Sequence, residues 1–442
     1  MARHDSRGIA TTLALGVLLL GGCAPPPVAP ASTAVLYQGA RLITGDGGAP
    51  IERGAILVEN GTIVAVGPLD RVQVPVGAAR VDLTGKTVMP ALIDMHSHLG
   101  YTNVKAMTTE AGNFTRANVE DHLRRYAYYG IAATLSMGVD RGEIAFDLRA
   151  HPVPGAAHLL TAGRGIALPN AGPGAEYRKD AAYGVTTEAD ARQAVREMAA
   201  RKADVIKIWV DDRDGTVTKL PPPMYAAIID ESHRHGLRVL AHIFDLVDAK
   251  GLLRAGVDGF AHGVRDTDID DEFLAQMKVR PEVFVIPNLP EREVGDDFTW
   301  LEGTLPAQEL QRLRASASAR TPVAATAARE LFEVQARNLA KLNALGVTIG
   351  FGTDSGVSVG WTAHTELADM VAAGMTPMQA LVAATRTSAR LLRLDRQGML
   401  ASGTRADFIV LDANPLDDIT NTRRIAGVYL QGIPVDRAAI MR

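Results

Sequence analysis

The 442-residue sequence has little of several features that would assign a chain to a class at once. It has a single cysteine, so an intramolecular disulfide is excluded. Aromatic residues make up 5% of the chain, which disfavours an aromatic stacking surface for bases. The formal net charge is -4, whereas a nucleic-acid partner would require a basic face. With 47% hydrophobic residues, the chain nevertheless has an ordinary globular composition and enough length for a large core.

The N-terminal segment has the pattern of an export signal. Arg3 and Arg7 precede an apolar run, residues 9–20, which is too short for a transmembrane helix. Residues 20–23 (LGGC) are similar to a bacterial lipobox, in which the cysteine becomes the lipidated first residue. We therefore expect a lipoprotein signal over residues 1–23 with a lipid on Cys23, followed by a Pro-rich tether over residues 24–34. The protein would then be exported and anchored in the membrane of the bacterial cell envelope, on its periplasmic face. A plain secretory signal with an incidental cysteine is the alternative.

Short strands and turns occupy both ends of the chain. Asn60-Gly61 separates two apolar stretches, and such a dipeptide favours a type I′ hairpin turn because both residues need a positive φ. Gln431-Gly432 does the same near the C-terminus. The economical arrangement is one small β-sandwich domain built from residues 35–87 and 403–442, with the middle of the chain inserted between them.

The middle of the chain alternates predicted strands with amphipathic helices. Thr187 with Asp190, and Thr376 with Pro377, are typical openings of two of these helices. A doubly wound open sheet is disfavoured because no Gly-rich phosphate loop follows the first strand. Eight strand–helix units over about 270 residues therefore predict a (β/α)₈ TIM barrel over residues 88–402, an α/β fold. The expected strands cover residues 88–95, 133–137, 158–162, 205–210, 238–243, 259–262, 283–287 and 348–353.

Side chains that can bind a metal stand at the ends of these predicted strands, where barrel enzymes hold their active sites. The first strand ends in His96-Ser97-His98, and residues two apart in a strand share one face. Each ligand type alone has an ordinary structural explanation, but together they predict a metal site. The other strand ends supply Lys207, His242, His262 and Asp354.

Lys207 is unusual because it lies among the apolar residues 205–210. A buried ammonium without a partner is unfavourable, so such a lysine needs a partner or a chemical change. Carbamylation by CO₂ would convert the neutral amine into an anionic ligand that can bridge two metals roughly 3.5–4 Å apart. We therefore expect a CO₂-derived carbamate on Lys207.

These motifs together resemble those of the amidohydrolase superfamily, in its imidazolonepropionase-like and Xaa-Pro dipeptidase branch. The resemblance extends from about residue 35 onward. It rests on the first-strand stretch 88–98, on the later ligand strands, and on the segments 373–377 and 403–408.

The resemblance implies two divalent metal ions, with zinc as the default because imidazole and carboxylate ligands suit it. Carboxylated Lys207 and a hydroxide would bridge the two ions, and Asp354 would accept and pass on the proton. In the family pattern one ion is held by His96, His98 and Asp354, and the second by His242 and His262.

The function implied is that of a metal-dependent hydrolase of amide C–N bonds in small molecules, such as dipeptides or N-acyl amino acids. Hydrolysis of an ester, a lactone or a phosphotriester at the same binuclear site is the alternative. A lipid-anchored binding protein on the same fold is the non-enzymatic alternative. A deaminase is disfavoured because no glutamate follows His242 closely and Lys207 would have no role.

The loops that shape substrate choice depart from the family pattern. Asn288 stands where relatives usually have threonine, and residues 211–215 form an acidic loop instead of a Gly-rich one. His233 and His235 lie two apart near a predicted helix end, so we expect them at the surface. The oligomeric state is not set by the sequence, and a homo-oligomer stays open. Expected substrate-binding residues on strand-end loops are Tyr101, Arg141, Arg164, Asn288, Trp361 and His364.

Overall fold

The computed structural model describes residues 33–289 and 297–440. The predicted signal, Cys23 and residues 24–32 of the tether lie outside the described residues. Among the described residues, no helix combines the length and the apolar character that crossing a membrane requires.

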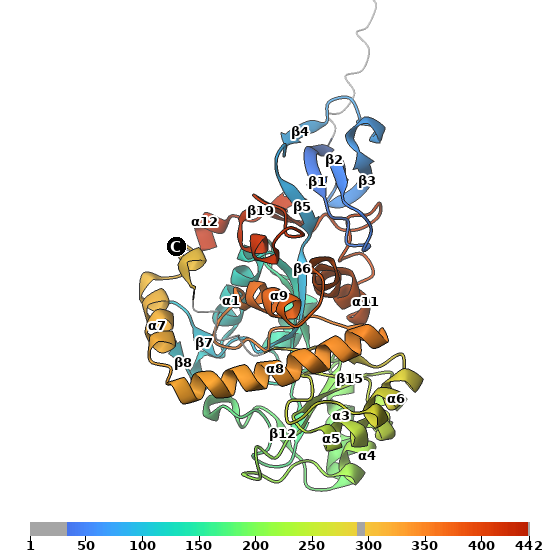
Figure 1. Ribbon diagram of the computed structural model, residues 1–442, viewed down its shortest axis with the longest axis vertical. Helices are drawn as coiled ribbons and strands as arrows, with labels where there is room; N and C mark the ends of the chain where they lie inside the picture. The colour runs from blue at the N-terminus through green and yellow to red at the C-terminus, as the bar shows by residue number, and fades with distance from the viewer. Residues whose placement is uncertain (1–32, 290–296, 441–442) are drawn as a thin grey trace, which may run out of the picture.

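Strands from both ends of the chain form one small sheet domain, which stands above the rest in Figure 1. The two predicted hairpin turns are present, with φ of 48° and 74° at Asn60 and Gly61 and of 53° and 72° at Gln431 and Gly432. Tyr37 from the first strand packs against Phe408 from the C-terminal half, with ring centroids 5.0 Å apart. The sheet has the order β20-β19-β18-β5-β1-β2-β3, with β4 beside β1. The strands are β1 (Val35–Leu42), β2 (Ile51–Glu59), β3 (Thr62–Pro68), β4 (Ala79–Asp82), β5 (Thr87–Pro90), β18 (Phe408–Leu411), β19 (Ile425–Leu430) and β20 (Ile433–Pro434).

The inserted residues form a closed barrel of parallel strands, as predicted. The backbone N–H of Asp204 donates to Thr161 O at 2.9 Å and joins the third strand to the fourth. Met95 N–H donates to Phe351 O at 2.8 Å, so the last strand returns to the first. A closed barrel excludes the open doubly wound sheet. In the described part of the chain the eight barrel strands are β6 (Leu92–Ser97), β9 (Ile131–Ser136), β10 (His158–Thr161), β13 (Ile206–Val210), β14 (Val239–Ile243), β15 (Gly259–Phe260), β16 (Phe284–Val285) and β17 (Thr348–Ile349).

The predicted first strand, residues 88–95, is two strands in the structure. β5 pairs with β18 of the small domain, whereas β6 pairs with β9 of the barrel. The exchange happens at Ala91, whose N–H donates to Asp407 O, while the next N–H, from Leu92, donates to Gly130 O. The sequence could not reveal this exchange, because both strands are fully buried and form one apolar run. The expected boundary between residues 87 and 88 therefore falls inside β5.

Helices cover the outside of the barrel, and the longest, α8, crosses it in Figure 1. The predicted capping box at Thr187 is present, because its hydroxyl accepts from Asp190 N–H and the Asp190 carboxylate accepts from the Thr187 backbone. A second box, Thr376 with Gln379, opens the helix that has Pro377 at its first position. The helices are α1 (Arg116–Tyr128), α2 (Ile144–Ala150), α3 (Glu188–Ala200), α4 (Pro222–Arg234), α5 (Leu246–Ala255), α6 (Asp271–Val279), α7 (Ala307–Ser318), α8 (Pro322–Leu345), α9 (Thr362–Ala372), α10 (Pro377–Val382), α11 (Ser388–Leu391) and α12 (Arg437–Ile440).

Short elements lie in the loops after the first and third barrel strands. They are β7 (Thr102–Asn103), β8 (Thr108–Thr109), β11 (Ile166–Ala167), β12 (Tyr183–Gly184) and the 3₁₀ turn η3 (Glu176–Arg178). His233 lies in the last turn of α4 and His235 caps that helix, and both are exposed. Their expected place at the surface is therefore correct.

Candidate metal centre

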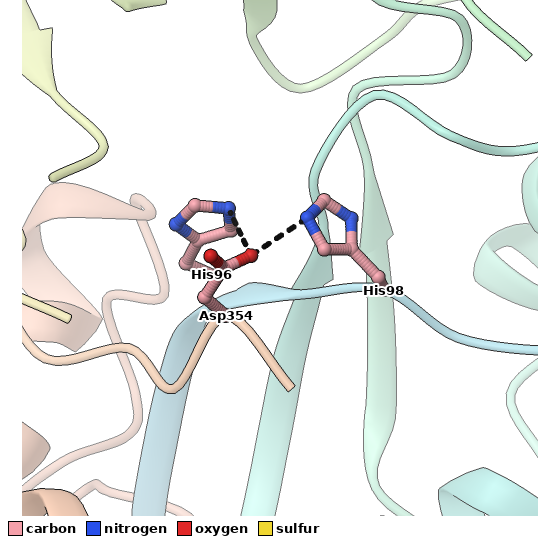
Figure 2. Close-up of side chains that lie close together, drawn as sticks. All are labelled: His96, His98 and Asp354. Carbon is pink, nitrogen blue, oxygen red and sulfur yellow. Dashed lines mark ion pairs between the residues drawn. The ribbon is translucent and has the colours of Figure 1, made fainter. Parts of the chain in front are cut away.

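The first and last barrel strands bring His96, His98 and Asp354 together at one end of the barrel (Figure 2). Asp354 Oδ1 lies 2.9 Å from His98 Nε2 and 3.4 Å from His96 Nε2. One ligand atom from each of the three lies within 4.8 Å of the others. Asp354 has a φ of 52°, a left-handed conformation that turns its side chain toward the two histidines.

The tautomer of His96 is set by partners on two other strands. Its Nδ1 lies 2.8 Å from Asn288 Oδ1 and 2.9 Å from Ala261 O, and both of these atoms can only accept. Nδ1 therefore carries the proton, and Nε2 presents a lone pair. That Nε2 is buried and has no hydrogen-bond partner among the described residues. An imidazole held by its other nitrogen in this way has the arrangement of a metal ligand.

The histidines of the site are neutral near pH 7. Burial lowers the pKa of His98 to about 4, and it lowers the pKa of His96 well below its usual value. Burial would raise the pKa of Asp354, but His96, His262 and His98 together hold it well below the usual value. Neutral imidazoles beside an ionised carboxylate are the donor set that a divalent cation requires.

His242 and His262 extend this group into a row of four imidazoles. The ring centroids of His96 and His262 are 5.0 Å apart, and those of His262 and His242 are 4.5 Å apart. His262 Nε2 also lies 3.6 Å from Asp354 Oδ2. Three of the four histidines therefore lie beside the Asp354 carboxylate, and His242 joins the row through its contact with the His262 ring.

The two histidines of the second predicted ion have different partners. His242 Nε2 lies 3.0 Å from Asp211 Oδ2, so Nε2–H donates and Nδ1 keeps the lone pair that a metal could use. Arg265 Nη2, which can only donate, lies 2.9 Å from His262 Nδ1, so the His262 proton sits on Nε2. A metal on His262 Nε2 therefore requires Arg265 to release Nδ1. The side chains around His96 can bind a first ion as they are arranged, whereas binding of a second ion by His262 requires Arg265 to move away.

Lys207 lies in the middle of β13 and is 1% exposed. Its Nζ has no hydrogen-bond partner among the described residues. Burial lowers its pKa to about 7, so a large share of the amine is neutral near that pH. Gly138 makes room for the stem, because a Cβ there would lie 2.8 Å from Lys207 Cβ. A buried amine without a hydrogen-bond partner is consistent with the predicted chemical change.

Asp94 is a further residue of the centre that the sequence argument missed. It is fully buried, and its carboxylate accepts from His96 N–H at 3.0 Å, from Thr353 N–H at 3.1 Å and from Thr353 Oγ1 at 2.8 Å. It therefore ties the strand of His96 to the segment of Asp354. The signal was present, because Asp94 lies two residues before His96 and so on the same face of the strand.

Three of the residues expected to bind substrate hold loops in place. Tyr101 donates its hydroxyl to Val139 O at 2.6 Å and accepts from Arg141 Nε at 3.1 Å, and Arg141 also pairs with Asp180. Arg164 donates to Ala182 O at 2.9 Å and stacks on a tyrosine ring. These contacts involve the Tyr101 hydroxyl and the Nε and Nη2 atoms of the two arginines, and the expected role of the three side chains in substrate binding stays a prediction.

Trp361 and His364 lie in an aromatic cluster and have structural contacts of their own. Trp361 packs edge-on against Trp300, with centroids 6.1 Å apart. His364 Nε2 donates to Tyr129 O, which lies just before β9 and hence near the opposite end of that strand from the metal ligands. Asn288 lies in the centre itself, where it accepts from His96, so its contact in the structure is with a ligand.

An apolar pocket of about 210 Å³ opens beside the centre. Its wall includes Val357, three residues after Asp354, and Thr102, whose hydroxyl donates to Gly356 O at 2.9 Å. Glu309 and Arg312 contribute charged groups to the same wall. The apolar part of the lining comes from Val104, Met107, Leu313 and Val357.

Comparison with known proteins assigns the chain to one enzyme family. The model of the amidohydrolase family matches residues 87–435. An imidazolonepropionase of Cereibacter sphaeroides is 28% identical over 385 residues, 83% of this chain and 90% of that protein. An uncharacterised protein of Mycobacterium tuberculosis is 29% identical over 329 residues, 72% of this chain and 78% of the other.

Solved structures are similar over nearly the whole chain. A putative prolidase from Bifidobacterium longum has a TM-score of 0.71 and 26% identity, and the match covers 93% of this chain and 98% of that one. A Xaa-Pro dipeptidase with bound methionine in its active site has a TM-score of 0.71 and 23% identity, over 91% of this chain and 99% of that one. The second likeness concerns the fold alone.

Proposed function

Because the chain belongs to the amidohydrolase family, in its imidazolonepropionase-like and Xaa-Pro dipeptidase branch, we propose that it is a metal-dependent hydrolase of amide C–N bonds. The proposed substrates are dipeptides or N-acyl amino acids. One observation carries the proposal: the buried Nε2 of His96, which has no hydrogen-bond partner among the described residues, lies beside His98 and 3.4 Å from the ionised Asp354. Such an arrangement is unfavourable without a cation and suits a divalent one.

His96, His98 and Asp354 would hold the first ion, and His242 and His262 the second, with carboxylated Lys207 between them. Two divalent ions, by default zinc, would supply Lewis acidity and a nucleophile at neutral pH. The neutral amine of Lys207 is the form that reacts with CO₂, and the site encloses that amine away from competing partners. Asn288 and Asp211 would orient His96 and His242 through their other ring nitrogens.

Asp354 would carry the proton from the attacking water to the leaving nitrogen. Its Oδ1 faces the two first-strand histidines and its Oδ2 faces His262, so the carboxylate is central to the row. The low pKa of this carboxyl keeps it ionised and able to accept a proton. A positioned acid–base group of this kind contributes roughly 10²–10⁴-fold in rate.

The test uses the protein loaded with zinc, manganese or cobalt in the presence of bicarbonate. We expect hydrolysis of N-acetyl amino acids or dipeptides, loss of at least about 10²-fold in kcat for Asp354→Asn, and partial rescue of Lys207→Ala by propionate. Exclusive hydrolysis of matched esters or lactones would support the ester-hydrolase alternative. Metal-loaded protein that hydrolyses none of these compounds would contradict the enzymatic proposal and favour the binding protein.

We also propose that Cys23 anchors the enzyme to a membrane of the cell envelope. The support is the sequence of residues 20–23 behind a short apolar run. In cell fractionation, the wild type should be found with membranes and Cys23→Ser with the soluble fraction. An unchanged distribution would contradict the anchor.

A further inference from the structure

Arg178 lies at the edge of the metal centre and has no hydrogen-bond partner for its Nε or Nη1 among the described residues, although its guanidinium carbon lies 5.7 Å from the centroid of the Tyr177 ring. It ends the short turn η3 in the loop that follows the third barrel strand. The Nε and Nη1 atoms are both enclosed. Arg141 and Arg164 differ from Arg178, because Arg141 pairs with Asp180 and Arg164 donates to backbone carbonyls.

The guanidinium of Arg178 faces the centre across Gly356. A Cβ placed on Gly356 would lie 3.0 Å from Arg178 Nη1 and 3.3 Å from His98 Cβ, so both side chains flank this glycine. The charge of Arg178 adds to burial in lowering the pKa of His98 and of Lys207. Arg178 is therefore close enough to act on a molecule bound at the metal ligands.

The carboxylates next to Arg178 in the chain are already paired. Glu176 lies 2.5 Å from Lys179 Nζ, and Asp180 pairs with Arg141. No carboxylate in the part of the chain that the structure describes lies within ion-pair distance of Arg178. The guanidinium is enclosed only at Nε and Nη1, and these two enclosed donors have no anion, which is unfavourable. The planar fork of a guanidinium matches a carboxylate in two hydrogen bonds.

We infer that Arg178 binds the free carboxylate of the substrate, so that the enzyme selects N-acyl amino acids or dipeptides with an unblocked C-terminus. This inference rests on the proposed function and adds the group that recognises the substrate. The apolar pocket meets the same glycine through Thr102 and Val357. An apolar amino acid such as leucine therefore suits the site and serves as the probe.

The kinetic test compares N-acetyl-leucine with N-acetyl-leucinamide, which lacks the carboxylate. Arg178→Gln should raise KM for the acid by roughly 10- to 100-fold, leave kcat within about threefold and leave the amide unaffected. Arg178→Lys should lie between the two. Lys179→Gln removes the same charge from the exposed neighbouring residue and should behave as wild type.

A second readout does not depend on turnover. Calorimetry on the metal-loaded protein should detect 4-methylpentanoate, the carboxylate of the probe without its nitrogen, and Arg178→Gln should weaken that binding by a similar factor. If the wild type hydrolyses neither compound, the proposed function fails, and the calorimetric comparison still decides the role of Arg178.

Three results would overturn the inference. The wild type could use the acid and the amide equally well, or Arg178→Gln could lower kcat for both alike, which would mean that Arg178 acts on Lys207 or His98. Unchanged binding of 4-methylpentanoate by Arg178→Gln would also contradict it.

Discussion

Replacement of Lys207 by methionine should make the metal-free protein more stable while it abolishes activity. Lys207 is 1% exposed and its Nζ has no hydrogen-bond partner among the described residues, so in the absence of metal and bicarbonate its charge is stabilised by no hydrogen bond, although the centroid of the Trp209 ring lies 5.5 Å away. Methionine has a similar length and no charge, so it fills the same space beside Gly138. Such a gain in stability is expected where a residue is retained for function although it destabilises the fold.

The size of the effect follows from the pKa of Lys207, which burial lowers from 10.5 to about 7. Between these values the unfolded chain binds more protons than the folded chain, so stability rises with pH across that window. Each pH unit corresponds to about 1.4 kcal/mol. At about pH 8 the lysine therefore destabilises the fold by roughly 3 kcal/mol, and the effect should be largest below about pH 7 and vanish near pH 10.5.

The assay is urea unfolding of the chelator-treated protein, with the wild type and Lys207→Met compared at several pH values. Lys105→Met, at an exposed position, is the matched control and should change the unfolding midpoint little. The reasoning is refuted if Lys207→Met is less stable than the wild type, or if its gain is the same at low and high pH.

Three further changes test the surroundings of the centre. Asn288→Ala should weaken binding of the first metal ion by roughly 10- to 100-fold, because the Asn288 oxygen that accepts from His96 Nδ1–H is lost. Metal titration measures this affinity, and an unchanged value would exclude the orienting role of Asn288. Arg265→Gln should tighten binding of the second ion by about tenfold, since His262 Nδ1 is then free of its cationic donor. Equal affinities of the variant and the wild type in calorimetry would refute the idea that Arg265 competes with the metal for His262. Burial lowers the His122 pKa from 6.5 to about 4, so the folded state loses stability as pH falls through that window. His122→Gln should therefore abolish about 3 kcal/mol of this loss of unfolding free energy at low pH. Acid unfolding curves of the variant and the wild type that coincide would show the argument to be wrong.

Local patterns in the sequence were enough for the elements and for much of the centre. The two hairpin turns, the helix openings at Thr187 and Thr376, and the alternation of strands and helices depend on neighbours within a few residues. His96 and His98 share a strand face for the same reason. The exchange of sheets at Ala91 was missed because it changes pairing partners and leaves the apolar pattern intact.

The contacts of the loop residues could not be predicted from local sequence patterns. Tyr101, Arg141 and Arg164 are polar residues near strand ends, as a substrate-binding residue would be; in the fold they contact backbone groups and neighbouring loops, and their part in substrate binding stays a prediction. Arg178 was overlooked because nothing in its local sequence marks it as unpaired. Only the absence of a carboxylate around it among residues 33–289 and 297–440 does so.

The sequence by itself determined which residues could bind a metal, because ligand chemistry and strand periodicity are local properties. Tertiary structure alone decided which nitrogen of each histidine is available. Asn288, 192 residues away in the sequence, holds the proton on His96 Nδ1, and Asp211, 31 residues away, holds the proton on His242 Nε2. A proton on an imidazole follows its hydrogen-bond partner, and these partners meet only when the barrel closes.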